Sequence, residues 1–424
     1  MKESALINLK KYSICISFTC NNPIYYFDGE GRLMGGFVDQ RNFRRSFTDQ
    51  LRQQWSLTKN GERIRCYHVL SQNEREAFFE QMFQMVVSIY QDLFKGEDEK
   101  IQITTTETIK SPRVMAINWL EKIVAFDKVA REKDIAAFKS IYRPVSILPP
   151  DQYLSLVLQL TEGCAYNRCT FCDFYKDRQF VIKSEAEFRD HIAAVKTFFG
   201  RSIKLRKSIF LADANALAMP MDQLLPMFKR INLAFNIAPD RSNINLPVWR
   251  EKHPIYFNGI YSFIDTFSAS QKSDTDFALL RQWNLKRVYI GVETGNVELL
   301  HFLRKPGTPE LMRETVNTIK AGGVQVGIIL LIGVGGKAYF DQHIQDTIQL
   351  VDKMNLSKGD LIYLSELVGN LNLEYFQNTA KANIEPLTPT QMKSQTQALK
   401  TGFQSLGEKN APQVSTYNIR EFIY

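Results

Sequence analysis

One stretch of the chain decides the fold: the apolar run Leu154-Ser-Leu-Val-Leu-Gln-Leu160, followed at once by Thr161-Glu-Gly-Cys164-Ala-Tyr-Asn-Arg-Cys169-Thr-Phe-Cys172. The run has the length and composition of a buried strand. Five more apolar runs follow it, separated by amphipathic helical segments. The six runs lie at residues 154–160, 208–212, 255–264, 288–292, 324–332 and 361–364. Strands that alternate with helices in this way predict an α/β domain of parallel strands joined by crossover helices.

This alternation favours a βα barrel or partial barrel over a doubly wound sheet, because no Gly-x-Gly-x-x-Gly motif follows the first run. In such barrels the chemistry lies on the loops after the carboxyl ends of the strands. The cysteine-rich segment is the first of these loops. Pro144, Pro149 and Pro150 precede the first run, so we expect a domain boundary there and a barrel domain at residues 151–380.

Residues 1–150 are expected to form an accessory domain of α+β type. Stretches rich in Ile, Phe, Tyr and Val at 11–19, 23–28 and 62–70 predict a small sheet. Ser71-Gln-Asn-Glu74 is typical of a capping box, and the helix that it begins is expected to end at Lys95-Gly96. Its predicted core residues are Phe79, Phe83, Val86, Tyr90 and Leu93. More helix is expected around 114–141, and residues 381–424 are expected to hold a C-terminal helix and a tail.

The composition is that of a globular protein. The chain has 424 residues, of which 44% are hydrophobic and 23% charged, so a disordered chain is excluded. Its longest unbroken apolar run, residues 327–334, is far shorter than the ~20 residues that a bilayer crossing needs. No membrane partner is therefore expected. The N-terminus lacks the pattern of a signal peptide, which predicts a cytoplasmic location.

Three of the six cysteines, Cys164, Cys169 and Cys172, lie within nine residues. In a reducing compartment such a cluster indicates metal binding or catalysis rather than a disulfide framework. Thiolates suit either zinc or an iron–sulfur cluster. A structural zinc site almost always has four protein ligands, and three cysteines are what a [4Fe–4S] cluster needs if one iron is to stay open for another ligand.

The loop Glu162-Gly-Cys-Ala-Tyr-Asn-Arg-Cys-Thr-Phe-Cys172 resembles the radical S-adenosylmethionine (radical SAM) superfamily, whose signature is three cysteines after the first strand of a partial (βα)6 barrel. It looks most like the subgroup of oxygen-independent coproporphyrinogen oxidase and the elongator-type RNA modifiers. The Cys-x4-Cys-x2-Cys spacing has one residue more in its first gap than the commonest family pattern. The resemblance covers roughly residues 145–375. It implies that Cys164, Cys169 and Cys172 hold a [4Fe–4S] cluster and that Phe171 packs near the adenine of SAM.

The same resemblance suggests further residues for SAM at the ends of later strands. Asp213 follows the second strand, where the family commonly holds the amino group of SAM; the alternative is a helix N-cap. Glu293, in Tyr289-Ile-Gly-Val-Glu-Thr-Gly295, matches a carboxylate that contacts SAM; the alternative is a structural salt bridge. Arg304 could pair with the SAM carboxylate or lie exposed. Gly333 ends the fifth strand where backbone approaches the adenine, and Ser365 and Glu366 end the sixth within reach of cofactor or substrate.

The resemblance implies an enzyme that cleaves SAM reductively and begins radical chemistry by abstracting a hydrogen atom. It also implies an electron donor such as flavodoxin or ferredoxin. A small organic molecule is the expected substrate, because no recognisable RNA-binding appendage is present. The alternative enzymatic function is RNA modification. The alternative outside the enzymes is a non-catalytic protein that binds an iron–sulfur cluster or zinc.

Two features of the N-terminal region leave alternatives open. Residues 41–65 hold seven basic and two acidic residues, with Phe43, Phe47 and Trp55 between them. A solvated face is favoured there over a nucleic-acid site. Cys15 and Cys20, together with Cys66 and His68, could bind zinc, although buried, inert thiols are favoured.

Overall fold

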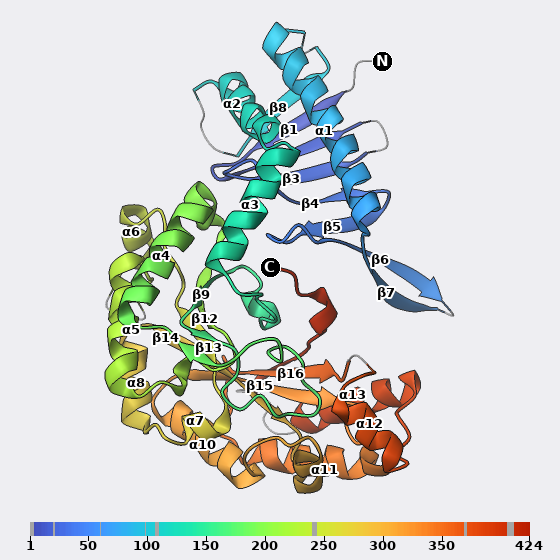
Figure 1. The fold of residues 1–424 in the computed structure, drawn as a ribbon, viewed down its shortest axis with the longest axis vertical. Coiled ribbons are helices and arrows are strands. Elements are labelled where there is room, and N and C mark those ends of the chain that lie inside the picture. Colours follow the sequence, from blue (N-terminus) through green and yellow to red (C-terminus); the bar gives the residue numbers. More distant parts are fainter. Residues whose placement is uncertain are drawn as a thin grey trace. The chain divides into compact units, whose positions relative to one another are not determined.

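The computed structural model describes residues 4–19, 22–59, 61–97, 99–106, 110–239, 244–368, 371–404 and 411–424. The chain forms two compact units (Figure 1). Unit 1 consists of Met1–Pro144, Ala193–Arg206 and Ile423–Tyr424, and unit 2 of Val145–Ile192 and Lys207–Phe422. Within the described ranges, no helix combines the length and the apolar character that a bilayer crossing requires.

Unit 1 is built on one eight-stranded sheet with the strand order β7-β6-β5-β4-β3-β2-β1-β8. Neighbouring strands are antiparallel, except that β1 and β8 are parallel. The strands are β1 (Ala5–Leu9), β2 (Ser13–Phe18), β3 (Ile24–Asp28), β4 (Leu33–Val38), β5 (Arg41–Arg45), β6 (Leu51–Lys59), β7 (Glu62–Val69) and β8 (Ile101–Thr105). The helices are α1 (Gln72–Lys95), α2 (Pro112–Ala125) and α3 (Lys128–Ile141).

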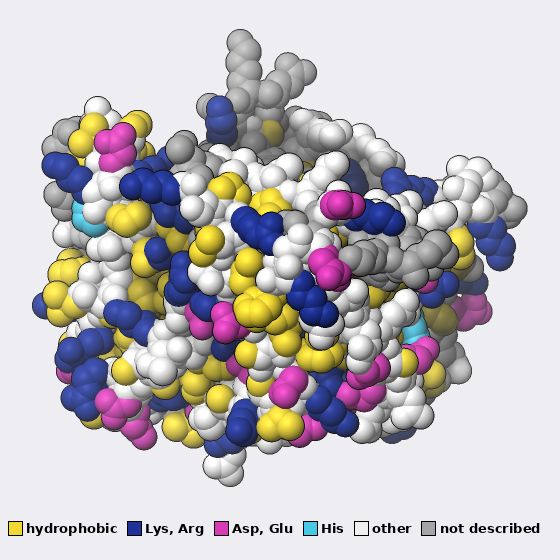
Figure 2. Space-filling model, turned by 90° about the horizontal axis from the view of Figure 1, so that it is seen from above, with side chains coloured by type: hydrophobic (Ala, Val, Ile, Leu, Met, Phe, Trp, Pro, Cys, Tyr) yellow, Lys and Arg dark blue, Asp and Glu magenta, His cyan; other side chains and the backbone are white. Residues whose placement is uncertain are grey.

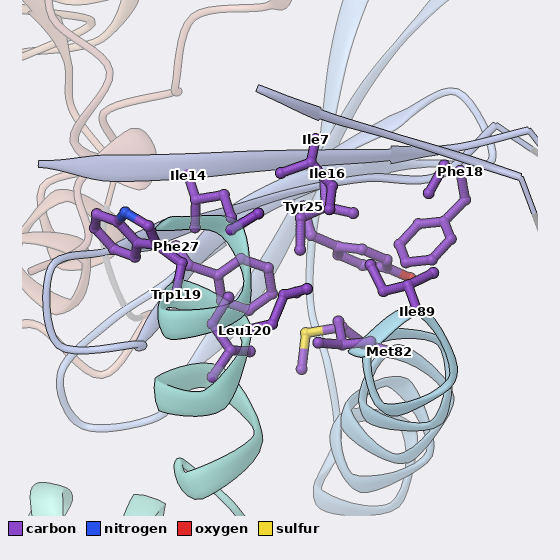
Figure 3. Close-up of a cluster of buried hydrophobic side chains, with 14 of the residues drawn as sticks. Ile7, Ile14, Ile16, Phe18, Tyr25, Phe27, Met82, Ile89, Trp119 and Leu120 are labelled. Carbon is purple, nitrogen blue, oxygen red and sulfur yellow. The ribbon is translucent and has the colours of Figure 1, made fainter. Parts of the chain in front are cut away.

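The core of unit 1 lies between one face of this sheet and the helices α1 and α2. Alternate residues of β2 are buried, as the period of two along a strand requires. Figure 3 shows Ile14, Ile16 and Phe27 pointing from the sheet toward Met82 of α1 and Leu120 of α2. The other face of the sheet contributes none of these core residues.

Helix α1 begins and ends where the sequence predicts. Ser71 accepts a hydrogen bond from the Glu74 amide while Glu74 accepts one from the Ser71 amide, which confirms the capping box. Gly96 ends the helix in the left-handed conformation, with φ of 80°. Two of the predicted core positions differ: Met82 and Ile89 are buried instead of Phe83 and Tyr90, because the buried stripe lies one residue closer to the N-terminus at these turns.

Unit 2 is built on seven parallel strands that follow one another through the sheet in the order β17-β16-β15-β14-β13-β12-β9. They are β9 (Ser155–Gln159), β12 (Ser208–Ala212), β13 (Ile260–Phe263), β14 (Leu285–Glu293), β15 (Gln325–Ile332), β16 (Leu361–Glu366) and β17 (Gln413–Thr416). Every residue of β9 and β12 is buried, as expected of strands covered on both faces. All carboxyl ends lie at one edge, where the loops meet.

Helices connect the strands of unit 2 and lie around the outside of the sheet (Figure 1). They are α4 (Glu185–Phe199), α5 (Met221–Ala234), α6 (Leu246–Lys252), α7 (Thr266–Ala269), α8 (Asp274–Gln282), α9 (Val297–Phe302), α10 (Pro309–Ala321), α11 (Phe340–Asp352), α12 (Glu374–Lys381) and α13 (Pro389–Gln404). The last residues of α4 belong to unit 1.

The expected fold class, a partial βα barrel with an α+β accessory domain, is confirmed. All six predicted barrel strands are present, and β17 adds a seventh. The N-terminal sheet is larger than predicted, because β4, β5 and β6 contain Gly, Arg and Gln rather than the apolar residues that mark a strand in sequence. Figure 2 shows Lys and Arg side chains interspersed with acidic and apolar ones over the face in view.

Candidate active site

The cysteine loop of unit 2 is closed at its base by a small antiparallel sheet. Strand β10 (Thr161–Glu162) pairs with β11 (Val181–Ile182), and residues 163–180 form the loop between them. Lys183 adds an ion pair with Glu162, 2.8 Å long. Because both ends are tied together, the loop is held over the carboxyl ends of the barrel strands.

The longer first gap of the cysteine motif contains a tight turn at Asn167, whose φ of 46° lies in the left-handed region. The Asn167 amide donates to the Cys164 Sγ at 3.4 Å, and its side chain donates to the Tyr175 carbonyl at 2.8 Å. Thr170 then fixes the second half of the loop: its amide donates to the Leu303 carbonyl, and its carbonyl accepts from the Tyr375 amide. The extra residue is thus taken up in a turn that is itself hydrogen-bonded.

Cys164, Cys169 and Cys172 are each partly buried and line one cavity. None is in a disulfide. Burial raises the pKa of the Cys172 thiol to about 12 and also raises that of Cys169, with the neighbouring sulfurs adding to the increase. Cys169 and Cys172 therefore lose their protons readily only when a metal replaces them.

This donor set fits a [4Fe–4S] cluster. Three soft sulfur ligands on one loop match a cluster in which each cysteine binds a different iron. Among the described residues, no three His, Cys, Asp or Glu side chains are grouped closely enough to hold one metal ion. A cluster does not require such a group, because its ligands are spread over several irons.

The cavity lies within unit 2 and has a volume of about 350 Å³. That is within the usual range for small-molecule sites. Phe263, Ile329 and Leu331 supply apolar wall, while Ser365 and Glu366, which the sequence places at the sixth strand end, also line it. Tyr289 lines it as well, and its hydroxyl donates to the Asp151 carboxylate at 2.5 Å.

Glu293 and Lys305 form an ion pair in the wall of this cavity. Lys305 Nζ lies 3.0 Å from Glu293 Oε1, and the two side chains are 12% and 7% exposed. Burial alone would lower the pKa of Lys305, but the Glu293 and Cys169 charges raise it overall, so the ammonium stays charged. Glu293 is turned toward the cavity by a bulge at the end of β14 and a φ of 65°.

Gly291 provides the space for this pair. A Cβ at that position would lie 2.2 Å from Glu293 Oε1 and 2.9 Å from Lys305 Nζ. No residue larger than glycine can occupy the position without displacing the two charged groups. Lys305 was not predicted from the sequence, although the adjacent Pro306 restricts the backbone before it and indicates a turn.

Phe171 lines the cavity and packs against Leu299, Leu303 and Leu331. The Phe171 ring is therefore held by packing in the wall of the cavity that the three cysteines line. An adenine bound there would contact a ring whose position is already fixed.

Asp213 is buried but does not line the cavity. Its carboxylate accepts hydrogen bonds from the Gln159 side chain and the Gly163 amide, both 3.0 Å long, and pairs with Arg178 at 3.2 Å. Burial raises the pKa of Asp213 in spite of these donors. The carboxylate joins both ends of the cysteine loop, a position different from the contact with the SAM amino group that the resemblance suggested.

Arg304 and Gly333 also lie away from the cavity lining. Arg304 is exposed and pairs with Glu374 of α12 at 2.7 Å. The Gly333 amide donates to Gln395 Oε1 at 2.7 Å, and a Cβ there would lie 2.5 Å from Met392 Sδ. Gly333 thus provides a close approach to α13.

Cys15 and Cys66 cannot share a metal in the way the sequence left open. Cys15 lies on β2 and Cys66 on β7, with β3 to β6 between them in the sheet. Five strand spacings of about 4.8 Å place them roughly 24 Å apart. His68 pairs instead with Glu74 at 3.3 Å. Cys20 lies outside the described residues.

Residues 158–351 match the family model described as the Radical SAM superfamily. No curated protein matches the chain. Among solved structures, coproporphyrinogen III oxidase of Escherichia coli is 14% identical, with 66% of this chain and 58% of that protein covered and a TM-score of 0.43. Elp3 of Methanocaldococcus infernus is 12% identical (62% and 56% covered, TM-score 0.38), and the methyltransferase TsrM of Kitasatospora setae 14% identical (53% and 39%, 0.35). The chain thus spans less than two thirds of the length of each.

Proposed function

We propose that the chain is an enzyme that uses a [4Fe–4S] cluster and SAM, because residues 158–351 match the Radical SAM superfamily, and that Cys164, Cys169 and Cys172 hold the cluster. One observation carries the proposal: three cysteines of one loop line the same cavity as the Glu293–Lys305 ion pair. We further propose that residues 151–380 form the catalytic domain and residues 1–150 an accessory domain.

When bound, the cluster and SAM supply reductive cleavage of the sulfonium C–S bond, which gives methionine and a 5′-deoxyadenosyl radical. The protein holds and orients the reactants. Lys305 is the only basic residue among the described residues that line the cavity, so it is suited to neutralise the carboxylate of SAM. This is the role that the resemblance suggested for Arg304. Glu293 holds the Lys305 ammonium in place and offers its second oxygen to SAM.

Asp213 acts as a positioning residue in this proposal. It holds the Gly163 amide directly before Cys164, and through Arg178 it holds the far end of the loop. A fixed loop keeps the three sulfurs apart at the spacing that a cluster needs, because the loop does not have to be ordered when the cluster binds. Phe171 is assigned to the adenine by its place on the wall.

The substrate is proposed to be a small organic molecule from which a hydrogen atom is abstracted. Asp173, Asp265 and Glu366 line the cavity besides Glu293, so acidic groups outnumber the single lysine. Such a lining repels a phosphodiester and favours a neutral or cationic substrate. An RNA-modifying enzyme remains the second candidate, favoured by the basic residues of unit 1. We propose a reductant of the flavodoxin or ferredoxin type and a cytoplasmic location.

Anaerobic reconstitution tests the proposal. Protein loaded with iron and sulfide and given SAM and dithionite is expected to release methionine and 5′-deoxyadenosine in equal amounts. The matched control is Lys305→Met, which should keep its iron and bind SAM more weakly. A colourless protein that binds zinc, or a brown protein that releases neither product, would contradict the proposal.

A further inference from the structure

Four tyrosines among the described residues line the cavity of unit 2, and their hydroxyl groups differ in what they contact. They are Tyr166, Tyr175, Tyr289 and Tyr417. The Tyr289 hydroxyl donates to the Asp151 carboxylate at 2.5 Å, and the Tyr417 hydroxyl donates to the Leu148 carbonyl at 2.6 Å. Neither acceptor residue lines the cavity, so the hydrogens of these two phenols are turned away from it.

Tyr175 is placed differently. The residue is only 6% exposed, yet its hydroxyl has no hydrogen-bond partner in the part of the chain that the structure describes. The hydroxyl is not one of the fully enclosed atoms that lack a partner, so it faces open space, and the cavity that Tyr175 lines supplies that space. Burying a hydroxyl without a hydrogen bond is unfavourable, so this position calls for an explanation.

The cysteine loop holds Tyr175 in this position. Its carbonyl accepts a hydrogen bond from the Asn167 side chain at 2.8 Å, and the Arg178 guanidinium lies 5.7 Å from its ring centre. Burial raises the pKa of Tyr175 well above its usual value, and the charges of Asp213 and Cys172 raise it further. The cavity therefore contains a phenol that keeps its hydrogen and that no neighbouring side chain engages.

A phenol can give a hydrogen atom to a carbon radical, because its O–H bond is weaker than an aliphatic C–H bond. The bonds to hydrogen in water, in the Ser365 hydroxyl and in the Lys305 ammonium are stronger, so these groups cannot. A thiol can also donate, but in the proposed function the three cysteines of the loop bind iron through their sulfurs and have no S–H bond. Phenols are thus the hydrogen-atom donors among the described residues of the cavity.

Two phenols without a hydrogen-bond partner remain, Tyr166 and Tyr175. Tyr166 lies between the first two cysteines and is partly exposed, whereas Tyr175 is buried. Closing a site to water prevents side reactions of reactive intermediates. The buried phenol is therefore the better placed of the two.

We propose that Tyr175 is a catalytic residue that gives its phenolic hydrogen atom to the carbon radical of the substrate, an inference that rests on the proposed function. The O–H bond breaks homolytically, a C–H bond forms on the substrate carbon, and the unpaired electron stays on the tyrosine. One electron from the reductant of flavodoxin or ferredoxin type and one proton from water then restore the hydroxyl. Each turnover takes one electron for SAM and one for Tyr175.

The test follows this hydrogen in heavy water, where phenolic hydrogens exchange for deuterium and C–H hydrogens do not. Full-length, cluster-loaded protein is given SAM and dithionite without substrate and without added thiol, so that the 5′-deoxyadenosyl radical itself meets Tyr175. We expect 5′-deoxyadenosine that carries one deuterium in mass spectra. Rapidly frozen samples should show the electron paramagnetic resonance spectrum of a tyrosyl radical.

Tyr175→Phe should lose the deuterium and the radical spectrum. It should keep its iron content and SAM affinity, because the ring and its packing remain. The matched control is Tyr417→Phe, which removes another phenol of the same cavity, one whose hydroxyl is bonded to the Leu148 carbonyl. The control should keep both the deuterium and the radical spectrum.

The inference is overturned if wild-type 5′-deoxyadenosine contains no deuterium, if Tyr175→Phe retains the deuterium, or if Tyr166→Phe or Tyr417→Phe removes it. It is also overturned if Tyr175→Phe loses its iron, since the hydroxyl would then support the loop. The proposed function survives these results as long as methionine and 5′-deoxyadenosine are formed in equal amounts. A protein that forms neither product contradicts the proposed function and this inference with it.

Discussion

The two large sheets of this protein place their polar residues by opposite rules. In the seven-stranded sheet of unit 2 all strands run the same way, so their carboxyl ends meet at one edge, where Asp213 follows β12 and Glu293 ends β14. In unit 1 most neighbours are antiparallel, so strand ends are divided between two edges. Its polar residues are instead spread over one face by the alternation along each strand.

The difference predicts what kind of partner each sheet suits. Loops that meet at one edge enclose a small volume, as the cavity lined by the three cysteines shows. A face of alternating side chains stays open and extends over several strands. The parallel sheet therefore suits a small, enclosed ligand, while the antiparallel sheet suits a more extended one.

The largest expected effect concerns iron. Anaerobically purified protein should be brown and hold about four irons per chain, and the triple variant Cys164→Ala/Cys169→Ala/Cys172→Ala should lose nearly all of it, because every protein ligand is removed. The double variant Cys15→Ser/Cys66→Ser changes thiols of the antiparallel sheet only and should keep a full complement. Iron and sulfide assays measure both. If the triple variant retained iron, the cysteines of the barrel loop would not be its ligands.

The second effect concerns the support of that loop. Asp213→Asn removes the buried carboxylate that pairs with the nearly buried Arg178, which keeps its ion pair with the exposed Asp177. Breaking a buried pair costs at most about 3–5 kcal/mol, and the remaining pair should reduce that cost. We expect trypsin to cleave the apo-protein faster after Lys176 and Arg178, and iron uptake to fall. Glu185→Gln breaks an exposed pair with Arg230 and serves as the control with little effect.

A different result for Asp213 would be equally informative. If the variant took up iron normally and resisted trypsin but bound SAM weakly, Asp213 would contact SAM as the sequence resemblance suggested. Combining Asp213→Asn with Arg178→Gln should restore part of the stability, because both charges of the buried pair are then removed together.

The third prediction is a loss of stability in acid that is confined to unit 2. Burial lowers the pKa of His343 to about 4, while an exposed histidine has a pKa of 6.5. Between these values the unfolded chain binds a proton that the folded chain does not, so stability falls as the pH drops from about 6.5 to 4. The difference between the two pKa values corresponds to a loss of about 3 kcal/mol in the free energy of unfolding.

Pulse proteolysis in urea, read separately from peptides of β15 and of β2, measures this effect in each unit. The apo-protein is used at both pH values, so that loss of the cluster does not contribute. His343→Gln should flatten the pH dependence of the β15 peptides. Equal acid sensitivity of both units in the wild type would show that another group dominates.

The smallest expected effect concerns SAM affinity. Gly291→Ala should displace the Glu293–Lys305 pair and weaken SAM binding about ten- to a hundredfold with the iron retained, and Glu293→Ala should do the same. Titration of SAM against the visible spectrum of the cluster measures the affinity. Gly36→Ala crowds the Ile24 carbonyl of the other sheet and should lower the melting temperature without changing SAM affinity. If Gly291→Ala bound SAM with unchanged affinity, the Glu293–Lys305 pair would not be part of the SAM site.

Much of unit 2 could be predicted from sequence because its signals are local. An apolar run predicts a buried strand, and closely spaced cysteines predict a metal-binding loop. The six strands and the three thiols can therefore be read from short stretches of sequence. The placement of Arg304 and Lys305 was not predictable in this way. Arg304 has a φ of 48° after α9, which turns the chain so that the next side chain faces the cavity. One left-handed residue decides which of two neighbouring cations is buried.

The places of Gly333 and of Arg44 and Arg45 depend on partners that are distant in sequence. Gly333 is close to Met392 and Gln395, and no pattern near residue 333 indicates that the C-terminal helix packs there. In unit 1, a count of charges in residues 41–65 cannot separate Arg44 from Arg45, which alternate between the two faces of β5. Cross-strand register supplies that distinction, and it exists only once the strands are paired.

The anchoring of the cysteine loop also has a consequence for how the protein is made. Thr170 donates to the Phe302 carbonyl, which follows it by 132 residues. At ordinary rates of translation this support leaves the ribosome about 7–26 s after the loop itself. During that interval the three thiols are in the cell without the contacts that shape their loop. Iron and sulfide delivered before the barrel closes would find no ordered site, so maturation of the enzyme has to follow the synthesis of α9 and α12.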